Sequence, residues 1–256
     1  MIDARAIVSP DAHLAPDVTV GPFSIIGPQV QIGARTVIGP HAVVNGPTTI
    51  GEDNRIFQFA SIGDAPQDKK YRGEPTQLVI GDRNVFRESC TMNRGTTHDQ
   101  GVTRIGDDNL FMAYSHVAHD CLIGNNTIFA NSVAMGGHVE VGDWAILGGL
   151  VAVHQFTKIG AHAFLGGGAI LSRDVPPYVM VAGNPAVPHG VNAEGLRRRG
   201  FSDESIRHIR EAYRVLYRSD LKLAEAVARL APLAEERAEI RSFVEFIQGS
   251  TRSLVR

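Results

Sequence analysis

The chain has 256 residues, a formal net charge of −2 at pH 7 and 43% hydrophobic residues, enough for one large domain or two small ones. So balanced a charge argues against nucleic acid as a partner. The longest apolar stretch, 145–153, is too short to span a bilayer, and the N-terminus lacks a signal peptide's apolar core. We therefore expect a cytoplasmic protein without an integral membrane segment.

An apolar residue, here called an anchor, recurs at every sixth position through most of the first two thirds of the chain. The anchors of the first run are Ile2, Val8, Leu14, Val20, Ile26, Ile32, Ile38, Val44, Ile50, Ile56 and Ile62. Those of the second run are Ile105, Phe111, Val117, Ile123, Phe129, Met135, Val141, Leu147, Val153, Ile159, Leu165 and Leu171. A period of six fits neither a helix nor an alternating strand, and it is typical of hexapeptide repeats that wind into a parallel β-helix. We predict such a β-solenoid, with three six-residue sides to each 18-residue coil, over residues 1–189.

Two segments interrupt the hexapeptide pattern. Residues 63–77 and 94–104 carry no anchors, although Ile80, Phe86 and Met92 continue the pattern between them. The 18 residues from Ile62 to Ile80 indicate that the register is kept across the first interruption. We predict that both segments leave the prism as loops, and long loops on a regular solenoid usually lie at its working face.

The two cysteines, Cys90 and Cys121, each follow an anchor by four residues. Small residues such as Ala, Ser and Thr occupy this position in the other repeats. We therefore interpret both thiols as small core groups that form no disulfide and act as no nucleophile, in a reducing compartment.

A helical period replaces the hexapeptide period after about residue 176. Ser202 is an expected N-cap for a helix through Tyr217, Asp220 for a second helix that Pro232 limits, and a third helix is expected at about 235–248. We predict a C-terminal helical domain, residues 190–256, that covers the open end of the β-helix. Its surplus of three positive charges suggests docking of an acidic partner, or simply a solvated helix face.

Four of the ten histidines gather within 39 residues, in positions between anchors. They are His116, His119, His138 and His154. Stacked coils lie about 4.8 Å apart, so residues 18 positions apart are expected one above the other. By this spacing Asp120 stacks with His138. His119 stacks with Gly137, and Gly137 in turn with Gln155, so all five should form one outward-facing patch.

This patch has the groups that acyl transfer needs. The imidazole of His119 can take a proton from an alcohol, and the carboxylate of Asp120 can hold its tautomer. The N–H of Gly137 can face a developing oxyanion. Without an activated serine or cysteine, direct attack on a thioester is the most economical mechanism. A zinc site formed by His116, His119 and His138 and a non-catalytic scaffold remain alternatives.

Six segments of the sequence resemble the acyl-ACP–UDP-N-acetylglucosamine O-acyltransferases, and the resemblance spans essentially the whole chain. They are 116–121 (HVAHDC), 136–139 (GGHV), 152–156 (AVHQF), 174–178 (DVPPY), 190–192 (GVN) and 195–201 (GLRRRGF). The resemblance implies a left-handed β-helix and a homotrimer with sites between subunits. It also implies transfer of a 3-hydroxyacyl chain from acyl carrier protein to the glucosamine 3-hydroxyl of UDP-GlcNAc, the first step of lipid A synthesis. We expect neither a metal nor a tightly bound cofactor. Another hexapeptide transferase, acting on an amine-bearing sugar, is the closest alternative.

The resemblance also assigns roles to single residues. It makes His119 the general base, Asp120 its partner and Gly137 the oxyanion donor. Contacts to the sugar nucleotide fall to His116, His138, Gln155, Asn192, Glu194, Arg198 and Arg199, and contacts to the acyl hydroxyl and pantetheine arm to Asp68 and Lys70. Phe164 and Gly167 correspond to the region that ends the acyl groove, but their opposite sizes select no chain length. Asn93 departs from the histidine expected in the family pattern, so we assign it no role.

Overall fold

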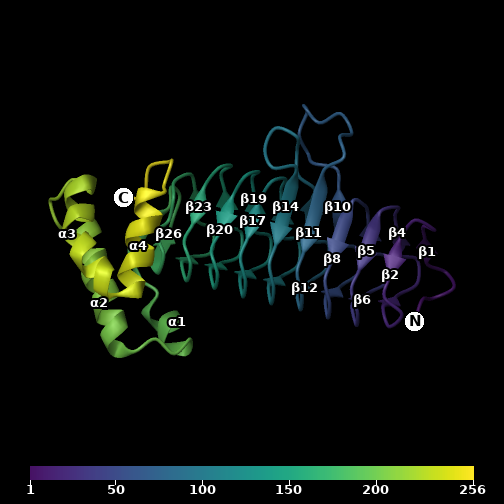
Figure 1. Cartoon of the computed structure of the whole chain (residues 1–256), viewed down its shortest axis with the longest axis horizontal. Coiled ribbons are helices and arrows are strands. Elements are labelled where there is room, and N and C mark those ends of the chain that lie inside the picture. The colour runs from purple at the N-terminus through teal and green to yellow at the C-terminus, as the bar shows by residue number, and fades with distance from the viewer.

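The computed structural model describes all residues, 1–256, as a three-sided prism of stacked coils with helices at its C-terminal end (Figure 1). Side 1 comprises β1 (Ile7–Val8), β4 (Ile25–Ile26), β7 (Val43–Val44), β10 (Ser61–Asp64), β13 (Thr91–Asn93), β16 (His116–Val117), β19 (Ala134–Met135), β22 (Ala152–Val153) and β25 (Ile170–Leu171). Side 2 comprises β2 (His13–Leu14), β5 (Val30–Ile32), β8 (Thr48–Ile50), β11 (Gln77–Ile80), β14 (Val102–Ile105), β17 (Leu122–Ile123), β20 (Glu140–Val141) and β23 (Lys158–Ile159). Side 3 comprises β3 (Thr19–Val20), β6 (Val37–Ile38), β9 (Arg55–Ile56), β12 (Val85–Phe86), β15 (Leu110–Phe111), β18 (Ile128–Phe129), β21 (Ile146–Leu147), β24 (Phe164–Leu165), β26 (Val179–Ala182) and β27 (Val187–Val191).

The anchors fill the interior of the prism, as the hexapeptide period predicts. Phe86, Phe111 and Phe129 are fully buried on successive rungs of side 3, with ring centroids 5.0 and 4.7 Å apart. Cys90 and Cys121 are fully buried free thiols, as predicted, and burial raises their pKa values to about 11 and about 12. These thiols are therefore neither nucleophiles nor disulfide partners here.

Most corners of the prism turn on a residue in the left-handed backbone conformation. At the corner between sides 1 and 2, for example, Asp120, His138 and Phe156 have φ values of 57°, 60° and 64°. Positive φ is uncommon outside glycine, and here it recurs at the same place in successive rungs. The side chains of these turn residues consequently line up along the corner.

Both predicted loops leave the prism at this same corner, where Figure 1 shows them rising side by side. They span residues 65–76 and 94–101, because strands β10, β11 and β14 extend into the ranges predicted from the sequence. The register prediction was wrong in one respect. Ile62 pairs with Met92 and Ile80 with Ile50, so the first loop lies within a 30-residue coil and Ile62 does not stack on Ile80.

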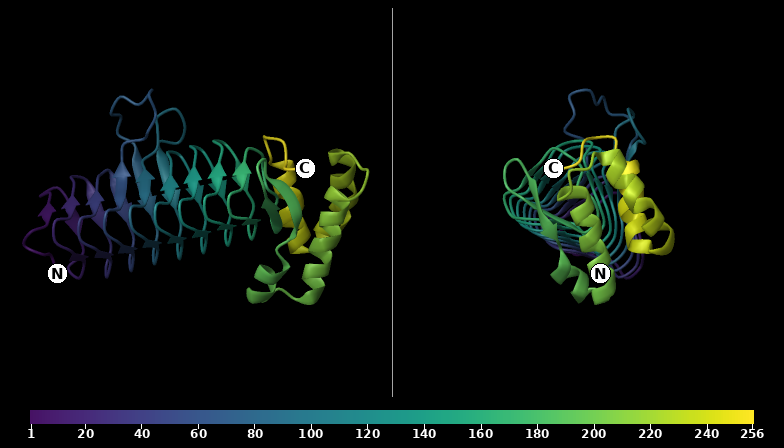
Figure 2. Two further views of the ribbon diagram at one scale, coloured as in Figure 1. Left: turned by 180° about the vertical axis from the view of Figure 1, so that it is seen from behind. Right: turned by 90° about the vertical axis from the view of Figure 1, so that its left-hand side faces the viewer.

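The C-terminal helices are α1 (Ala193–Arg198), α2 (Asp203–Tyr217), α3 (Leu223–Glu236) and α4 (Ala238–Gln248), and they lie over the end of the prism (Figure 2). The Ser202 side chain caps α2 as predicted. Asp220 does not cap α3. Lys222 is its N-cap instead, and its backbone N–H donates to Glu225. Pro232 lies inside α3 rather than ending it. Leu230 before it and Ala234 after it are both buried, so packing continues along the helix past the proline.

Three further features complete the fold. Side 3 continues past residue 176, because β26 pairs in parallel with β24 and then antiparallel with β27. The chain end returns to the solenoid through a bridge between Asp174 and Leu254. None of the helices combines the length and the apolarity that crossing a membrane requires.

We predict that Phe111→Ala lowers the free energy of unfolding by about 3–5 kcal/mol, because it leaves a cavity in the middle of the buried phenylalanine stack. Equilibrium denaturation at one fixed protein concentration measures the change. Val79→Ala, on the outer face of β11, is the control and should cost far less. Equal losses for the two variants would contradict the inward orientation of the anchors.

Candidate active site

A pocket of about 580 Å³ lies at the corner between sides 1 and 2, beneath the two loops. The first loop contributes Asp68 and Lys70 to its wall, and the corner contributes His119, His138 and Gln155. The sequence analysis assigned all five of these residues to one site. The solenoid therefore brings together a histidine pair, an amide, a carboxylate and an ammonium group.

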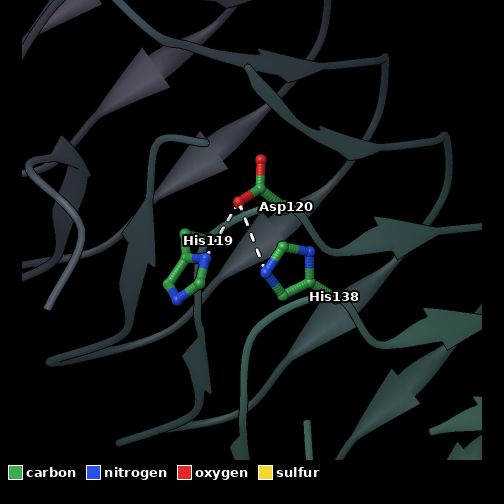
Figure 3. Close-up of side chains that lie close together, drawn as sticks. All are labelled: His119, Asp120 and His138. Carbon is green, nitrogen blue, oxygen red and sulfur yellow. Dashed lines mark hydrogen bonds and ion pairs between the residues drawn. The ribbon is translucent and has the colours of Figure 1, made fainter. Parts of the chain in front are cut away.

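His119 and Asp120 form a hydrogen-bonded pair. The Nδ1 of His119 donates to Oδ2 of Asp120 over 2.9 Å, and its side chain is 15% exposed. Because Nδ1 carries the proton, Nε2 of the neutral ring keeps a lone pair for another proton. Figure 3 shows this ring and that of His138 directed at the same carboxylate oxygen. This pairing matches the arrangement predicted from the sequence.

Asp120 itself is not on the outside of the prism, contrary to the predicted outward-facing patch. Its side chain is only 1% exposed because the second loop covers it. The backbone N–H of Thr96 donates to both carboxylate oxygens over 2.9 and 3.0 Å, and its hydroxyl donates to Oδ2 over 2.6 Å. Burial opposes ionisation, but the hydrogen bonds from His119 and Thr96 outweigh it and hold the pKa of Asp120 below its ordinary value. A buried anion therefore stands behind the imidazole.

Gly137 lies directly against the ring of His119, as the 18-residue spacing predicts. A Cβ at this position would come within 2.5 Å of the His119 ring, so only glycine lets the two rungs meet here. The residue is buried, and its N–H donates to no acceptor within the chain. This amide remains available to an external oxygen.

His138 occupies the rung above Asp120. Its ring stacks on Phe156 with centroids 4.3 Å apart and meets His119 edge-on at 5.0 Å. Its Nδ1 donates to Asp99 of the second loop over 2.7 Å, and its Nε2 lies 3.9 Å from Oδ2 of Asp120. Both ring nitrogens therefore face carboxylates.

The remaining histidines of the cluster differ from these two. His116 is hydrogen bonded through Nδ1 to Thr91 over 2.7 Å, and burial lowers its pKa. His154 is exposed, and its Nδ1 contacts the carbonyl of Gln155. Neither histidine lines the pocket.

The residues that could hold a metal ion are His119, Asp120 and His138, whose donor atoms lie within 4.8 Å of one another. His116, a member of the metal set considered from the sequence, is not among them. Oδ2 of Asp120 already accepts hydrogen bonds from His119 and Thr96. The geometry is that of an oriented imidazole–carboxylate pair.

A second group of predicted residues lies at a different corner, between sides 2 and 3. Asn192 caps α1 and donates to the carbonyl of His162 over 3.0 Å, while Glu194 and Arg198 form an exposed ion pair. Arg199 lies over the ring of Trp144 at 5.2 Å. Its guanidinium also contacts His162, whose pKa is lowered to about 4 by burial and by that positive charge. One protomer does not bring these four residues to His119.

The two positions predicted to end the acyl groove, and Asn93, to which no role was assigned, also lie outside the pocket wall. Phe164 is on side 3, and Gly167 is exposed at the next corner. Asn93 is buried and donates to the carbonyl of Ala65 over 3.0 Å, whereas its Oδ1 has no partner. This amide therefore fastens the start of the first loop.

Sequence reasoning missed the residues that support the site from the second loop and from the start of β14. Thr96 and Asp99 hold Asp120 and His138, and the hydroxyl of Thr103 accepts from the backbone N–H of Asp120 over 2.8 Å. The only signal for them was that the loop interrupts the repeats next to the histidine cluster. The 18-residue spacing could not place side chains that are outside the coils.

Residues 174–255 match the family described as Udp N-acetylglucosamine O-acyltransferase, Domain 2, and residues 11–46 and 103–137 match the bacterial transferase hexapeptide repeats. The acyl-[acyl-carrier-protein]–UDP-N-acetylglucosamine O-acyltransferase of Thiobacillus denitrificans is 58% identical over 100% of this chain and 99% of its own. That of Herminiimonas arsenicoxydans is 56% identical, with the same coverage.

Solved structures match along the whole chain. The UDP-N-acetylglucosamine acyltransferase of Francisella novicida superimposes with a TM-score of 0.98 at 43% identity, covering 100% of this chain and 94% of its own. The UDP-N-acetylglucosamine O-acyltransferase of Moraxella catarrhalis has a TM-score of 0.98 at 45% identity, with coverage of 100% and 99%. These structures confirm the predicted left-handed parallel β-helix with a helical C-terminal part.

We predict that Thr96→Val lowers the free energy of unfolding by about 1–3 kcal/mol at pH 7, because the buried carboxylate of Asp120 loses its hydroxyl donor. The folded-state pKa of Asp120 is depressed, so its contribution is present above the unfolded value of about 3.9 and is lost as the pH falls through the folded value. The variant raises the folded value, so the deficit should shrink below about pH 4.

Denaturant midpoints measured at pH 7 and at about pH 3 test this expectation. Thr97→Val, an exposed neighbour without a hydrogen bond to the site, is the control. A deficit that stays constant on acidification would show that the hydroxyl does not act on the ionised carboxylate.

Proposed function

The chain belongs to the UDP-N-acetylglucosamine O-acyltransferase family, and on this basis we propose that it transfers an acyl chain from acyl carrier protein to UDP-GlcNAc. The names of the relatives give this coarse reaction. We further propose a 3-hydroxyacyl donor, the glucosamine 3-hydroxyl as acceptor, and a cytoplasmic role in the first step of lipid A synthesis. The observation that carries the proposal is the His119–Asp120 pair, whose free Nε2 borders a polar pocket.

His119 acts as the general base. Nε2 takes the proton of the sugar hydroxyl while that oxygen attacks the thioester carbonyl and forms the new C–O bond. The C–S bond then breaks, and the proton held on Nε2 passes to the departing thiolate of the carrier. Asp120 supports both stages, because its buried negative charge fixes the tautomer and stabilises the imidazolium between them.

Gly137 stabilises the oxygen that becomes negative during the attack. Its N–H lies one rung from His119 and has no acceptor of its own in the chain. A donor that is already oriented costs no reorganisation when the charge develops. The base and the oxyanion donor can therefore act on opposite sides of one thioester carbon.

The pocket wall provides contacts for both substrates. Lys70 supplies a positive charge for the phosphate of the pantetheine arm. Asp68 can bind the acyl hydroxyl, and its Oδ1 accepts from the backbone N–H of Lys70 over 2.9 Å. Gln155 and His138 border the sugar. His116 lies on β16, just before His119 and outside the pocket wall, and in this proposal it meets the part of the substrate that extends beyond the pocket. In this proposal Phe164 and Gly167 bound the acyl groove, and their sizes select no chain length.

A homotrimer explains why the predicted nucleotide contacts lie at another corner. The edge between sides 3 and 1 exposes Phe23, Phe59, Tyr114 and Leu150, each more than half exposed. If that apolar edge lies along a threefold axis, side 1 of one protomer faces side 3 of the next. The site corner then meets the neighbour's corner between sides 2 and 3, which brings the partner subunit's Asn192, Glu194, Arg198 and Arg199 to His119. Arginine suits this task because its planar fork binds phosphate in a bidentate manner.

We predict that His119→Ala lowers the rate of acyl transfer by roughly 10²–10⁴-fold, the usual contribution of general base catalysis, without loss of the fold. Asp120→Ala should cost less, because it removes orientation rather than the base. Mass spectrometry of UDP-GlcNAc incubated with 3-hydroxyacyl carrier proteins of several lengths measures the product, and circular dichroism monitors the fold. His189→Ala, an exposed histidine outside the site, is the control. Substantial turnover by His119→Ala would remove the assigned base.

We predict that inactive His119→Ala and Arg199→Ala variants regain activity when their subunits are mixed by unfolding and refolding together. In a trimer with shared sites, roughly a quarter of the sites then combine an intact His119 with the partner's intact Arg199. Light scattering should first give a mass of three 27.6-kDa chains for each variant. Trimers that stay inactive after mixing would place all site residues in one chain.

A further inference from the structure

The second loop contacts two successive rungs of the site. Thr96 donates to Asp120 on one rung, and Asp99 accepts from His138 on the next. Gly95 makes this approach possible, because a Cβ there would lie 2.7 Å from Oδ1 of Asp120 and closer still to the backbone of Val102. The loop is therefore connected to both carboxylate–imidazole pairs.

These contacts create a second pair that parallels the first. His119 donates Nδ1–H to Asp120, and His138 donates Nδ1–H to Asp99 over 2.7 Å. The ring of His138 also stacks on Phe156, which holds its plane but sets neither the flip of the ring nor which nitrogen carries the proton. Asp99 is within hydrogen-bond distance of Nδ1, whereas Oδ2 of Asp120 is 3.9 Å from Nε2 and accepts no hydrogen bond from it. The proton of the neutral ring is therefore held on Nδ1, and the lone pair is on Nε2.

The negative charge of Asp99 bears on what this residue can do in the pocket. A carboxylate at the wall of a pocket for a sugar diphosphate is repelled by the phosphates. Its side chain is 39% exposed, and its only ionic partner is His138. The arrangement is consistent with a residue that acts through the histidine it holds.

We propose that Asp99 is a positioning residue for the acceptor sugar: it fixes the orientation and tautomer of His138, so that Nε2 accepts a hydrogen bond from a sugar hydroxyl. The assignment rests on the proposed function. The two pairs then divide the work. His119 removes a proton, while His138 holds the sugar before and during the reaction.

Asp99→Ala tests the proposal. An interaction made equally in the ground state and the transition state lowers KM without changing kcat. We therefore expect Asp99→Ala to raise KM for UDP-GlcNAc about tenfold, the equivalent of one hydrogen bond, with kcat little changed. Asp99→Asn keeps an oxygen that accepts from Nδ1 and should restore KM to within about twofold. Gln100→Ala, on the same loop and exposed, should leave both constants unchanged.

The tautomer of His138 is read directly by ¹⁵N NMR of the substrate-free protein, with His138→Gln to assign its signals. Asp99→Ala should change the His138 signature and leave that of His119 in place, whereas Asp99→Asn should preserve both. This readout does not depend on turnover, so a wild-type protein inactive on UDP-GlcNAc would defeat the proposed function alone. An unchanged His138 tautomer in Asp99→Ala, an unchanged KM, or an equal effect of Gln100→Ala would overturn the role of Asp99.

Discussion

The vertical hydrogen bonding between coils is the constraint on which the rest of this structure depends. Each strand pairs in parallel with the strand one coil away, so a residue is placed by its number in the coil more than by its neighbours in sequence. The backbone turns at most corners on a left-handed residue, so that the side chains at one corner line up from rung to rung. His119, Gly137 and Gln155 meet at one corner for this reason, although His119 and Gln155 are 36 positions apart in the sequence.

Asp120 shows how a regular scaffold acquires a reactive group. A buried carboxylate is unfavourable unless it is hydrogen bonded, and the coils alone do not supply enough donors. The second loop provides three hydrogen bonds through Thr96, and the charge becomes stable enough to orient an imidazole. The site thus combines two kinds of structure. The rungs set the spacing of His119, Gly137 and Gln155, and the irregular second loop provides hydrogen-bond partners for Asp120 and His138.

The sequence predicts the regular coils of this structure well and its irregular loops poorly. The helical period after about residue 176 predicts the C-terminal helices. The six-residue period predicts the interior and the stacked pairs, because each coil repeats the one before it. It failed where the repeat is broken. Ile62 stacks on Met92 because the first loop lengthens its coil, and the burial of Asp120 and the contacts of Asp99 depend on loop atoms without a period. The predictions that Asp220 caps the second long helix and that Pro232 ends it were wrong, because tertiary packing overrides local helix signals. The contacts that we propose for Asn192 and Arg199 across subunits could not be found from any pattern within one chain.

Helices cover the prism at its C-terminal end only, so local unfolding is expected to begin at the N-terminal end. Helices seal the C-terminal coils, whereas no rung covers the first coil, where Ile2 is half exposed. Strands there have a hydrogen-bonded neighbour on one side alone, so they can peel away without breaking any other rung. The histidine pair lies several turns inward from this fraying edge. Local opening of the N-terminal coil can therefore occur without displacing the residues of the proposed site.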